Sequence, residues 1–268
     1  MTTLAAAART VLLTADARAK AHASRAMAAA WGAGAVAWAF DVAMPEVPAR
    51  PGRPELLAPN KMPKRGKAGS ARSRIALLHA VAHIELNAID LAWDMAGRFG
   101  RGFPRGFADD WVRVADDEAR HFLMVADRLV ELGAAYGDLP AHDGLWKAAQ
   151  ATAHDAAARL AVVPQVLEAR GLDVTPGMAA RLAAAGDSKS AEILESIYRD
   201  EIGHVRIGNS WFRSACDSNG SPPAATFRAL VGTYFRGELK PPFNDLARSQ
   251  AGLSRDYYDS LSPADSLA

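Results

Sequence analysis

The sequence predicts an all-α protein whose centre is a four-helix bundle. Four long segments carry apolar residues at helical spacings of three and four, and stretches rich in Gly and Pro separate them. Two of these segments contain Glu-x-x-His, Glu118 to His121 and Glu201 to His204. Each of the other two contains a Glu 33 residues earlier, Glu85 and Glu168. The chain therefore consists of two Glu … Glu-x-x-His halves, offset by 83 residues.

Residues 1–72 are expected to form an N-terminal segment outside the bundle. Residues 1–38 are rich in Ala with scattered charge, which predicts one or two short helices that break near Gly32 and Gly34. Residues 44–63 contain six prolines, which exclude a helix and favour an extended arm that lies over a neighbouring surface. A disordered linker is the alternative for this arm.

A basic run joins the arm to the bundle. Its positive charge could receive a phosphate or an acidic partner, and a solvated loop is the simpler interpretation. The run consists of Lys61, Lys64, Arg65, Lys67, Arg72 and Arg74.

The bundle is expected to cover residues 73–215. Its helices are predicted at residues 73–96, 107–132, 145–170 and 188–215. Glu85 lies in the middle of an apolar stripe, where a carboxylate is costly unless a cation compensates it. His79 and His83 lie off this stripe and are expected to be structural or to support the ligands. Pro164 should bend the third helix and free a carbonyl one turn before Glu168.

Beyond the third helix, residues 171–187 are expected to form a connection with a short helix after Pro176. Residues 216–268 are expected to form a C-terminal extension that packs on the bundle, with a helix near residues 224–234.

The composition is that of an ordinary globular protein and excludes several classes of site. The 268 residues are 50% apolar and 23% charged, and the net charge of +1 gives no indication of a nucleic-acid partner. The single cysteine, Cys216, excludes an intramolecular disulfide framework and metal sites built on several cysteines. No stretch approaches the roughly 20 uninterrupted apolar residues of a membrane span, and the N-terminus lacks a signal-peptide pattern. A cytoplasmic protein without a membrane partner is therefore expected.

The two Glu-x-x-His motifs predict a dinuclear metal site. A Glu and a His three residues apart project from the same helix face, so both can bind one ion. Oxygen and nitrogen ligands without a thiolate favour iron or manganese over copper, and zinc also accepts these ligand types. The alternative is that two surface helices carry Glu and His by coincidence. The six predicted ligands are Glu85, Glu118, His121, Glu168, Glu201 and His204.

Within this set, Glu118 and Glu201 are expected to bridge the two ions. Glu85 with His121, and Glu168 with His204, would then complete one ion each.

Three further residues are candidates beside the ligands. Asp117 and Asp200 each precede a motif Glu, and each is expected to accept the N–H of the ligating imidazole on the opposite helix. The alternative is that both aspartates face solvent. Tyr198 lies one turn before Glu201 and is a candidate catalytic residue that could carry a radical or orient a water. Packing is the alternative role for this ring.

At these residues the sequence resembles the ferritin-like superfamily, whose members use the pattern Glu, Glu-x-x-His, Glu, Glu-x-x-His. Asp-Glu-Ala-Arg-His at residues 117–121 is similar to the helix motif of bacterial multicomponent monooxygenases and ribonucleotide reductase small subunits. A closer resemblance, to the bacterial family known as domain of unknown function 455, covers most of the chain. It rests on His79-Ala-Val-Ala-His-Ile-Glu85, Tyr136-Gly-Asp-Leu-Pro-Ala-His142, Leu167-Glu-Ala-Arg-Gly-Leu-Asp173 and Asp200-Glu-Ile-Gly-His204. That family is regarded as ferritin-like, and its activity is not settled.

The resemblance implies a ferritin-like four-helix bundle with two iron ions, or two manganese ions. The expected function is an oxygen-activating oxidoreductase of the hydroxylase or oxygenase type. It would use O2, a small organic substrate and an electron-donor protein, as a monomer or homodimer. Iron handling or peroxide scavenging is the alternative, and the long segments on both sides of the bundle favour an enzyme. A tRNA hydroxylase is a further alternative, supported only by the basic run and opposed by the small net charge.

Overall fold

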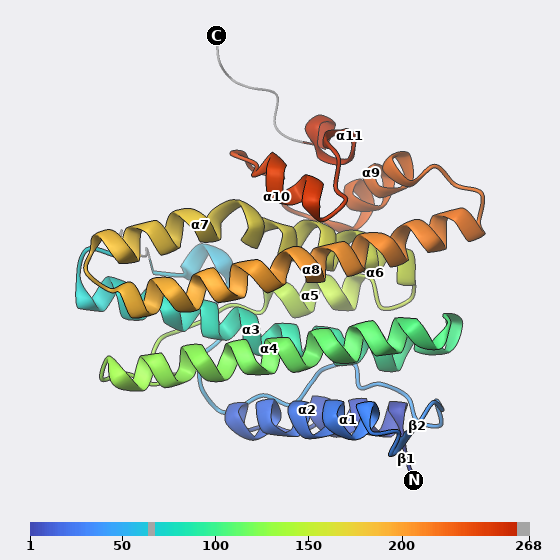
Figure 1. The fold of residues 1–268 in the computed structure, drawn as a ribbon, viewed down its shortest axis with the longest axis horizontal. Coiled ribbons are helices and arrows are strands. Elements are labelled where there is room, and N and C mark those ends of the chain that lie inside the picture. The colour runs from blue at the N-terminus through green and yellow to red at the C-terminus, as the bar shows by residue number, and fades with distance from the viewer. Residues whose placement is uncertain (64–67, 262–268) are drawn as a thin grey trace. The chain divides into compact units, whose positions relative to one another are not determined.

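The computed structural model describes residues 1–63 and 68–261, and this part of the chain is predominantly helical (Figure 1). Its short strands, β1 (Thr2–Thr3) and β2 (Val36–Ala37), pair in parallel. The all-α class is therefore confirmed. The chain divides into two compact units, Met1–Trp146 and Lys147–Ala268. This boundary falls inside the predicted bundle segment 73–215, between its two Glu … Glu-x-x-His halves.

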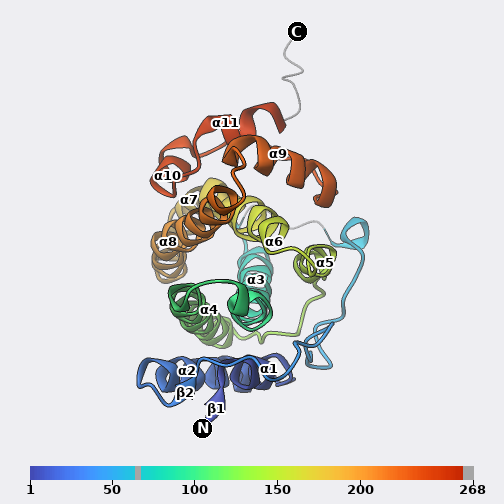
Figure 2. The same ribbon diagram turned by 90° about the vertical axis from the view of Figure 1, so that its right-hand side faces the viewer.

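Unit 1 is built on two long helices, α3 (Ala71–Phe99) and α4 (Arg105–Glu131), which pack along each other. Figure 2 shows α1 (Leu4–Leu12) and α2 (Ala17–Gly32) as a second layer of this unit, with α1 against α3 and α2 against α4. α3 and α4 match the predicted helices at 73–96 and 107–132, with ends displaced by a few residues, and α1 and α2 are two short helices of the kind expected in residues 1–38. Single-turn helices occur at η1 (Pro59–Lys61) and η2 (Gly100–Gly102).

The proline-rich arm is ordered along α3. Arg50 donates to Asp90 and to Asn87, each at 2.7 Å, and Lys20 from α2 donates to the same Asp90 at 2.5 Å. Farther along α3, Arg98 pairs with Asp94 and donates to the carbonyl of Pro45. The buried side chains of Asn87, Asp90 and Asp94 on α3 thus bind the arm through Arg50 and Arg98. Residues 44–58 contain no helix, as the prolines predict, whereas Pro59–Lys61 form the single-turn helix η1.

His79 and His83 have the structural role expected of them. The Nε2 atom of His79 accepts the backbone N–H groups of Gly137 and Leu139, at 2.9 and 3.4 Å. The Nδ1 atom of His83 lies 2.9 Å from the hydroxyl of Tyr136. Both imidazoles therefore hold the loop after α4 against α3.

Unit 2 contains one long helix, α8 (Ser188–Ser218), with α7 (Ala169–Ala184) packed along it. The segment before α7 is less regular than expected. It consists of α5 (Gly144–Ala151), α6 (Ala156–Val162) and a π-helical turn, η3 (Val163–Glu168). The single predicted helix at 145–170 is therefore wrong. Asp155 starts α6 by accepting the N–H groups of Ala157 and Ala158, which ends continuity with α5.

The predicted connection at 171–187 is also wrong, because α7 continues through Pro176 to Ala184. A proline inside a helix removes the N–H that would bond to the carbonyl four residues earlier, here that of Leu172. The side chain of Asn244 donates to this carbonyl at 3.1 Å. A residue from the C-terminal segment therefore satisfies the group that Pro176 leaves open.

The C-terminal segment folds back on α7 and α8, as expected. It contains α9 (Pro223–Tyr234), α10 (Asp245–Gln250), α11 (Arg255–Tyr258) and η4 (Asp259–Leu261). Arg248 on α10 donates twice to the buried carboxylate of Asp173 on α7, at 2.7 and 2.8 Å. Its guanidinium also lies over the rings of Phe243 and Tyr258. This buried, stacked ion pair anchors the segment to unit 2.

Candidate metal centre

Unit 1 brings three of the six predicted ligands together. Glu85 projects from α3, whereas Glu118 and His121 project one turn apart from α4. The Nδ1 atom of His121 lies 3.3 Å from Oε2 of Glu85 and 3.4 Å from Oε2 of Glu118. One potential ligand atom from each residue lies within 4.8 Å of the others. The side chains of Glu118 and His121 are fully buried, and that of Glu85 is 5% exposed.

The electrostatics of this cluster suit a cation. Burial raises the pKa of Glu85 from 4.5 to about 7; the negative charge of Glu118 adds to the rise and His121 opposes it. Two carboxylates held so close in a buried position repel each other unless a proton or a positive ion compensates them. Carboxylate oxygen and imidazole nitrogen are ligands that divalent iron, manganese and zinc accept. The cluster therefore fits a metal ion.

Unit 2 contributes the other three predicted ligands. Glu201 and His204 lie one turn apart on α8, with Nδ1 of His204 3.9 Å from Oε2 of Glu201. His204 is buried, and the side chain of Glu201 is 12% exposed. Glu168 is the last residue of the π-helical turn, in the segment that packs against α8. Each unit thus contains two of the predicted Glu ligands and one of the predicted His ligands, in line with the two halves of the sequence.

The π-helical turn has identifiable causes. Pro164 has no N–H to bond to the carbonyl of Leu160, and the side-chain amide of Gln165 donates to that carbonyl at 3.0 Å instead. The N–H of Ala169 bonds back to the carbonyl of Pro164, five residues earlier, which is the π-helical spacing. The predicted freed carbonyl is therefore confirmed, and the expected kink takes the form of a π-helical turn.

Gly208 lets this turn approach α8 closely. A Cβ atom on Gly208 would lie 2.4 Å from Cβ of Pro164, which no side chain could tolerate without movement. Gly208 lies one turn beyond His204, and Pro164 lies one turn before Glu168. Gln165 and Gly208 were missed from the sequence as site-forming residues. Their positions one turn from the predicted ligands were the available signal.

The three candidates beside the ligands, Asp117, Asp200 and Tyr198, differ in their exposure and contacts. Asp117 accepts from Arg120 on its own helix at 3.1 Å, and its side chain is 31% exposed. Asp200 is partly exposed on α8. The hydroxyl of Tyr198 accepts from the side chain of Asn244 at 3.0 Å, so this ring also holds the C-terminal segment. The bonds from Asp117 and Asp200 to ligating imidazoles, and a catalytic role for Tyr198, stay predictions.

The basic run falls partly outside the described residues. Lys64, Arg65 and Lys67 lie outside them, and the side chain of Arg72 is exposed at the start of α3.

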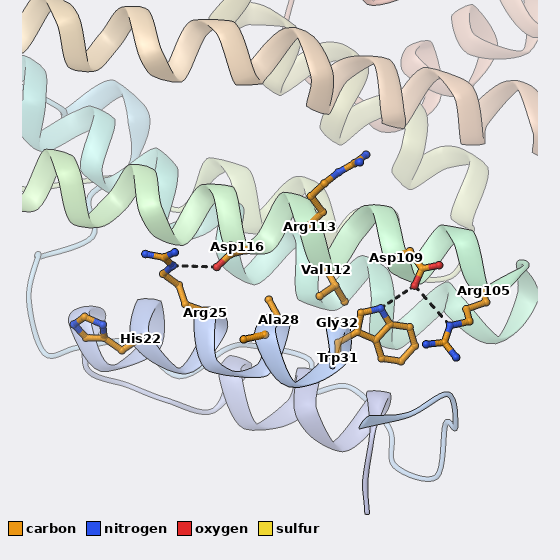
Figure 3. Close-up of a pocket in the computed structure, with 11 residues that line it drawn as sticks. His22, Arg25, Ala28, Trp31, Gly32, Arg105, Asp109, Val112, Arg113 and Asp116 are labelled. Carbon is orange, nitrogen blue, oxygen red and sulfur yellow. Dashed lines mark hydrogen bonds and ion pairs between the residues drawn. The ribbon is translucent and has the colours of Figure 1, made fainter. Parts of the chain in front are cut away.

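A surface groove of about 640 Å³ lies between α2 and α4 (Figure 3). Arg25 pairs with Asp116 at 3.1 Å. Trp31 donates to Asp109 at 2.9 Å, and Arg105 lies over the Trp31 ring. The charged groups therefore join the two helices, and none of the predicted site residues lines the groove.

One helical stretch, Ala71–Gly102, is long and apolar enough to cross a membrane, but 72% of its apolar window is buried inside the protein. This degree of burial is typical of a core helix. A cytoplasmic location stays a prediction.

Comparison with known proteins identifies the family. The model of the family described as "Protein of unknown function (DUF455)" matches residues 13–259. The chain belongs to the DUF455 family. It is 45% identical over 219 residues to a protein of Haemophilus influenzae described as uncharacterized, covering 80% of this chain and 76% of that protein. No solved structure gives a significant match. All six predicted ligands lie within the part of the chain that DUF455 matches.

Proposed function

We propose that this DUF455 chain is a ferritin-like protein with a dinuclear metal site. The two ions would bind to Glu85, Glu118, His121, Glu168, Glu201 and His204. The observation that carries the proposal is the cluster in unit 1, where two buried carboxylates lie 3.3 and 3.4 Å from the Nδ1 atom of His121. The 33-residue spacing within each half of the sequence extends the argument to unit 2.

The proposed bundle consists of α3, α4, α8 and the segment from α6 to α7. These are the helices that hold the six residues. In chain order they supply Glu, Glu-x-x-His, Glu and Glu-x-x-His, which is the set of motifs that dinuclear carboxylate bundles use. Asp117 and Asp200 would accept the second N–H of each ligating imidazole, which orients the ring and makes it a stronger ligand. The long segments before and after these helices would limit access of water and substrate to the site.

The reaction we propose is oxygen-dependent oxidation of a small organic substrate, with iron as the native metal and manganese as the second choice. Two reduced iron ions would supply the electrons that reduce O2. The chain's own carboxylates would balance the charge of the ions, and the buried surroundings of Glu85 and Glu118 would exclude bulk water. An electron-donor protein would then restore the reduced form.

Metal content and oxygen consumption test this proposal together. The purified full chain, loaded anaerobically with Fe(II), is expected to hold two ions per chain. Exposure to O2 should consume oxygen in proportion to the protein and then stop until a reductant is added. A chain that never retains more than a trace of metal would rule the site out.

The iron-storage alternative gives a different result in the same samples. A storage protein would assemble into a large shell and accumulate many iron ions per chain. Size-exclusion chromatography beside an iron titration separates the two functions. A monomer or dimer that saturates at two ions supports the enzyme, and a large oligomer that takes up tens of ions per chain contradicts it.

A further inference from the structure

The indole N–H of Trp111 on α4 is buried but makes no hydrogen bond within the described residues. The Trp111 side chain is 1% exposed, and its Nε1 atom has no acceptor in residues 1–63 and 68–261. By contrast, the buried indoles of Trp31, Trp93 and Trp146 donate to oxygen atoms of the protein at 2.9, 2.7 and 3.1 Å. An unpaired buried N–H is costly, so the Trp111 N–H requires an acceptor from elsewhere.

Trp111 lies on the face of α4 that carries predicted metal ligands. It precedes Glu118 by two helical turns, so both side chains project from the same face, roughly 10 Å apart along the axis. A row of aromatic rings leads to Trp111 from the beginning of α4. Partly exposed Phe103 stacks on buried Phe107 with 4.2 Å between ring centroids, and the Phe107 ring lies 6.2 Å from that of Trp111. The unpaired donor therefore lies between an aromatic row and the predicted ligands, within unit 1.

We propose that the Trp111 N–H binds a neutral carbonyl oxygen of an elongated apolar substrate, whose other end reaches Glu118 roughly 10 Å away. This proposal rests on the proposed oxidation and names the class of its substrate. A single N–H satisfies a carbonyl oxygen, but it does not compensate the charge of a buried carboxylate, so the bound oxygen is neutral. Phe107 offers an apolar surface to the carbon skeleton. An analogue without the oxygen leaves the N–H unpaired and binds more weakly.

Indole N–H resonances of the full chain, loaded with Zn(II) and labelled at tryptophan nitrogen, test the proposal. The probes are two neutral ketones of different length, benzylacetone and phenylbutyl methyl ketone, each compared with its matched hydrocarbon, butylbenzene or hexylbenzene. A ketone should move the Trp111 N–H resonance downfield, as hydrogen bonding does, and its hydrocarbon should not. A Trp111 N–H in contact with a buried water, and unmoved by both ketones, would overturn the proposal. The wild-type spectra decide this without any variant.

Trp111→Phe keeps an aromatic ring and removes the N–H. The ketone that moves the resonance should bind this variant about fivefold more weakly, as expected for the loss of one hydrogen bond, with hydrocarbon affinity and Zn(II) content unchanged. Trp93→Phe is the matched control, because that fully buried indole already donates to Ser24, and it should keep the wild-type ketone affinity. Equal ketone affinity in Trp111→Phe and the wild type would overturn the carbonyl site and leave the metal site in place. A wild type that retains no Zn(II) would instead overturn the proposed function.

Discussion

At the scale of single residues, the site depends on acidic groups placed where water does not stabilise their charge. Glu85 and Glu118 are buried on facing positions of α3 and α4, and His121 lies between them. The sequence predicts their identity and spacing, and in the structure the three side chains lie together.

Asp117→Ala and Asp200→Ala should each weaken metal affinity by about 10–100-fold if these aspartates orient the ligating imidazoles. Co(II) affinity from chelator competition measures the effect. Asp116→Ala is a matched control for Asp117, because Asp116 is the adjacent residue on α4 and pairs with Arg25 instead. Metal binding equal to that of the control in both variants would place the two aspartates among ordinary surface residues.

The buried imidazole of His79 should make the stability of the protein depend on pH. Burial lowers its pKa from 6.5, with Asp138 opposing the shift, and its Nε2 atom accepts two backbone N–H groups in the neutral form. Because the unfolded chain binds this proton more readily, the stability that neutral His79 contributes is present above pH 6.5 and is lost as the pH falls toward the lowered pKa. The slope for one proton is at most about 1.4 kcal/mol per pH unit.

His79→Gln keeps an acceptor for the N–H of Gly137 but removes the titration. Urea unfolding at pH 7 and pH 5 should therefore show a smaller loss of stability in this variant than in the wild type. His22→Gln, at an exposed position of α2, should behave like the wild type. An unchanged pH dependence in His79→Gln would show that this imidazole does not titrate with unfolding.

At the scale of helices and turns, the segment that holds Glu168 is the least regular part of the proposed bundle. Pro164 opens the helical register, Gln165 satisfies the carbonyl of Leu160, and Gly208 provides the space on α8. These three residues depend on one another, so a substitution at one of them should alter the position of Glu168. The two α8 glycines offer a direct comparison.

Gly208→Ala should destabilise unit 2 by about 1–3 kcal/mol, because the new methyl group would collide with the ring of Pro164. Gly203→Ala is the matched control on the same helix, since a Cβ atom there meets nothing within 4 Å. This control should be neutral or more stable by up to about 1 kcal/mol. Urea unfolding gives both values, and equal stability of the two variants would contradict the close packing.

At the scale of the whole molecule, the six predicted ligands are divided between two compact units, three in each. A ligand that binds only the folded chain stabilises it in proportion to the logarithm of its free concentration. Metal should therefore stabilise the complete protein, and not only the helix that carries a given ligand.

Free Co(II) at a hundred times its dissociation constant should raise the free energy of unfolding by about 2.7 kcal/mol for one ion. Thermal unfolding with Co(II) and with a chelator measures the shift. The double variant Glu85→Gln and Glu168→Gln, which lacks one predicted ligand in each half, should show a much smaller shift. An equal shift in the variant would mean that the metal binds elsewhere on the chain.

The sequence alone determined the all-α class, the extents of α3, α4 and α8, and the residue types of the candidate ligands. These features are local, because a helix repeats every three to four residues and a Glu-x-x-His motif lies within one turn. Only the tertiary structure decided the course of the arm, the π-helical turn and the continuation of α7 through Pro176. Each depends on a partner far away in the sequence: Asp90 meets Lys20 across 70 residues, and Asn244 reaches Leu172 across 72. Such contacts leave no periodic pattern, since their energy comes from groups that only folding brings together.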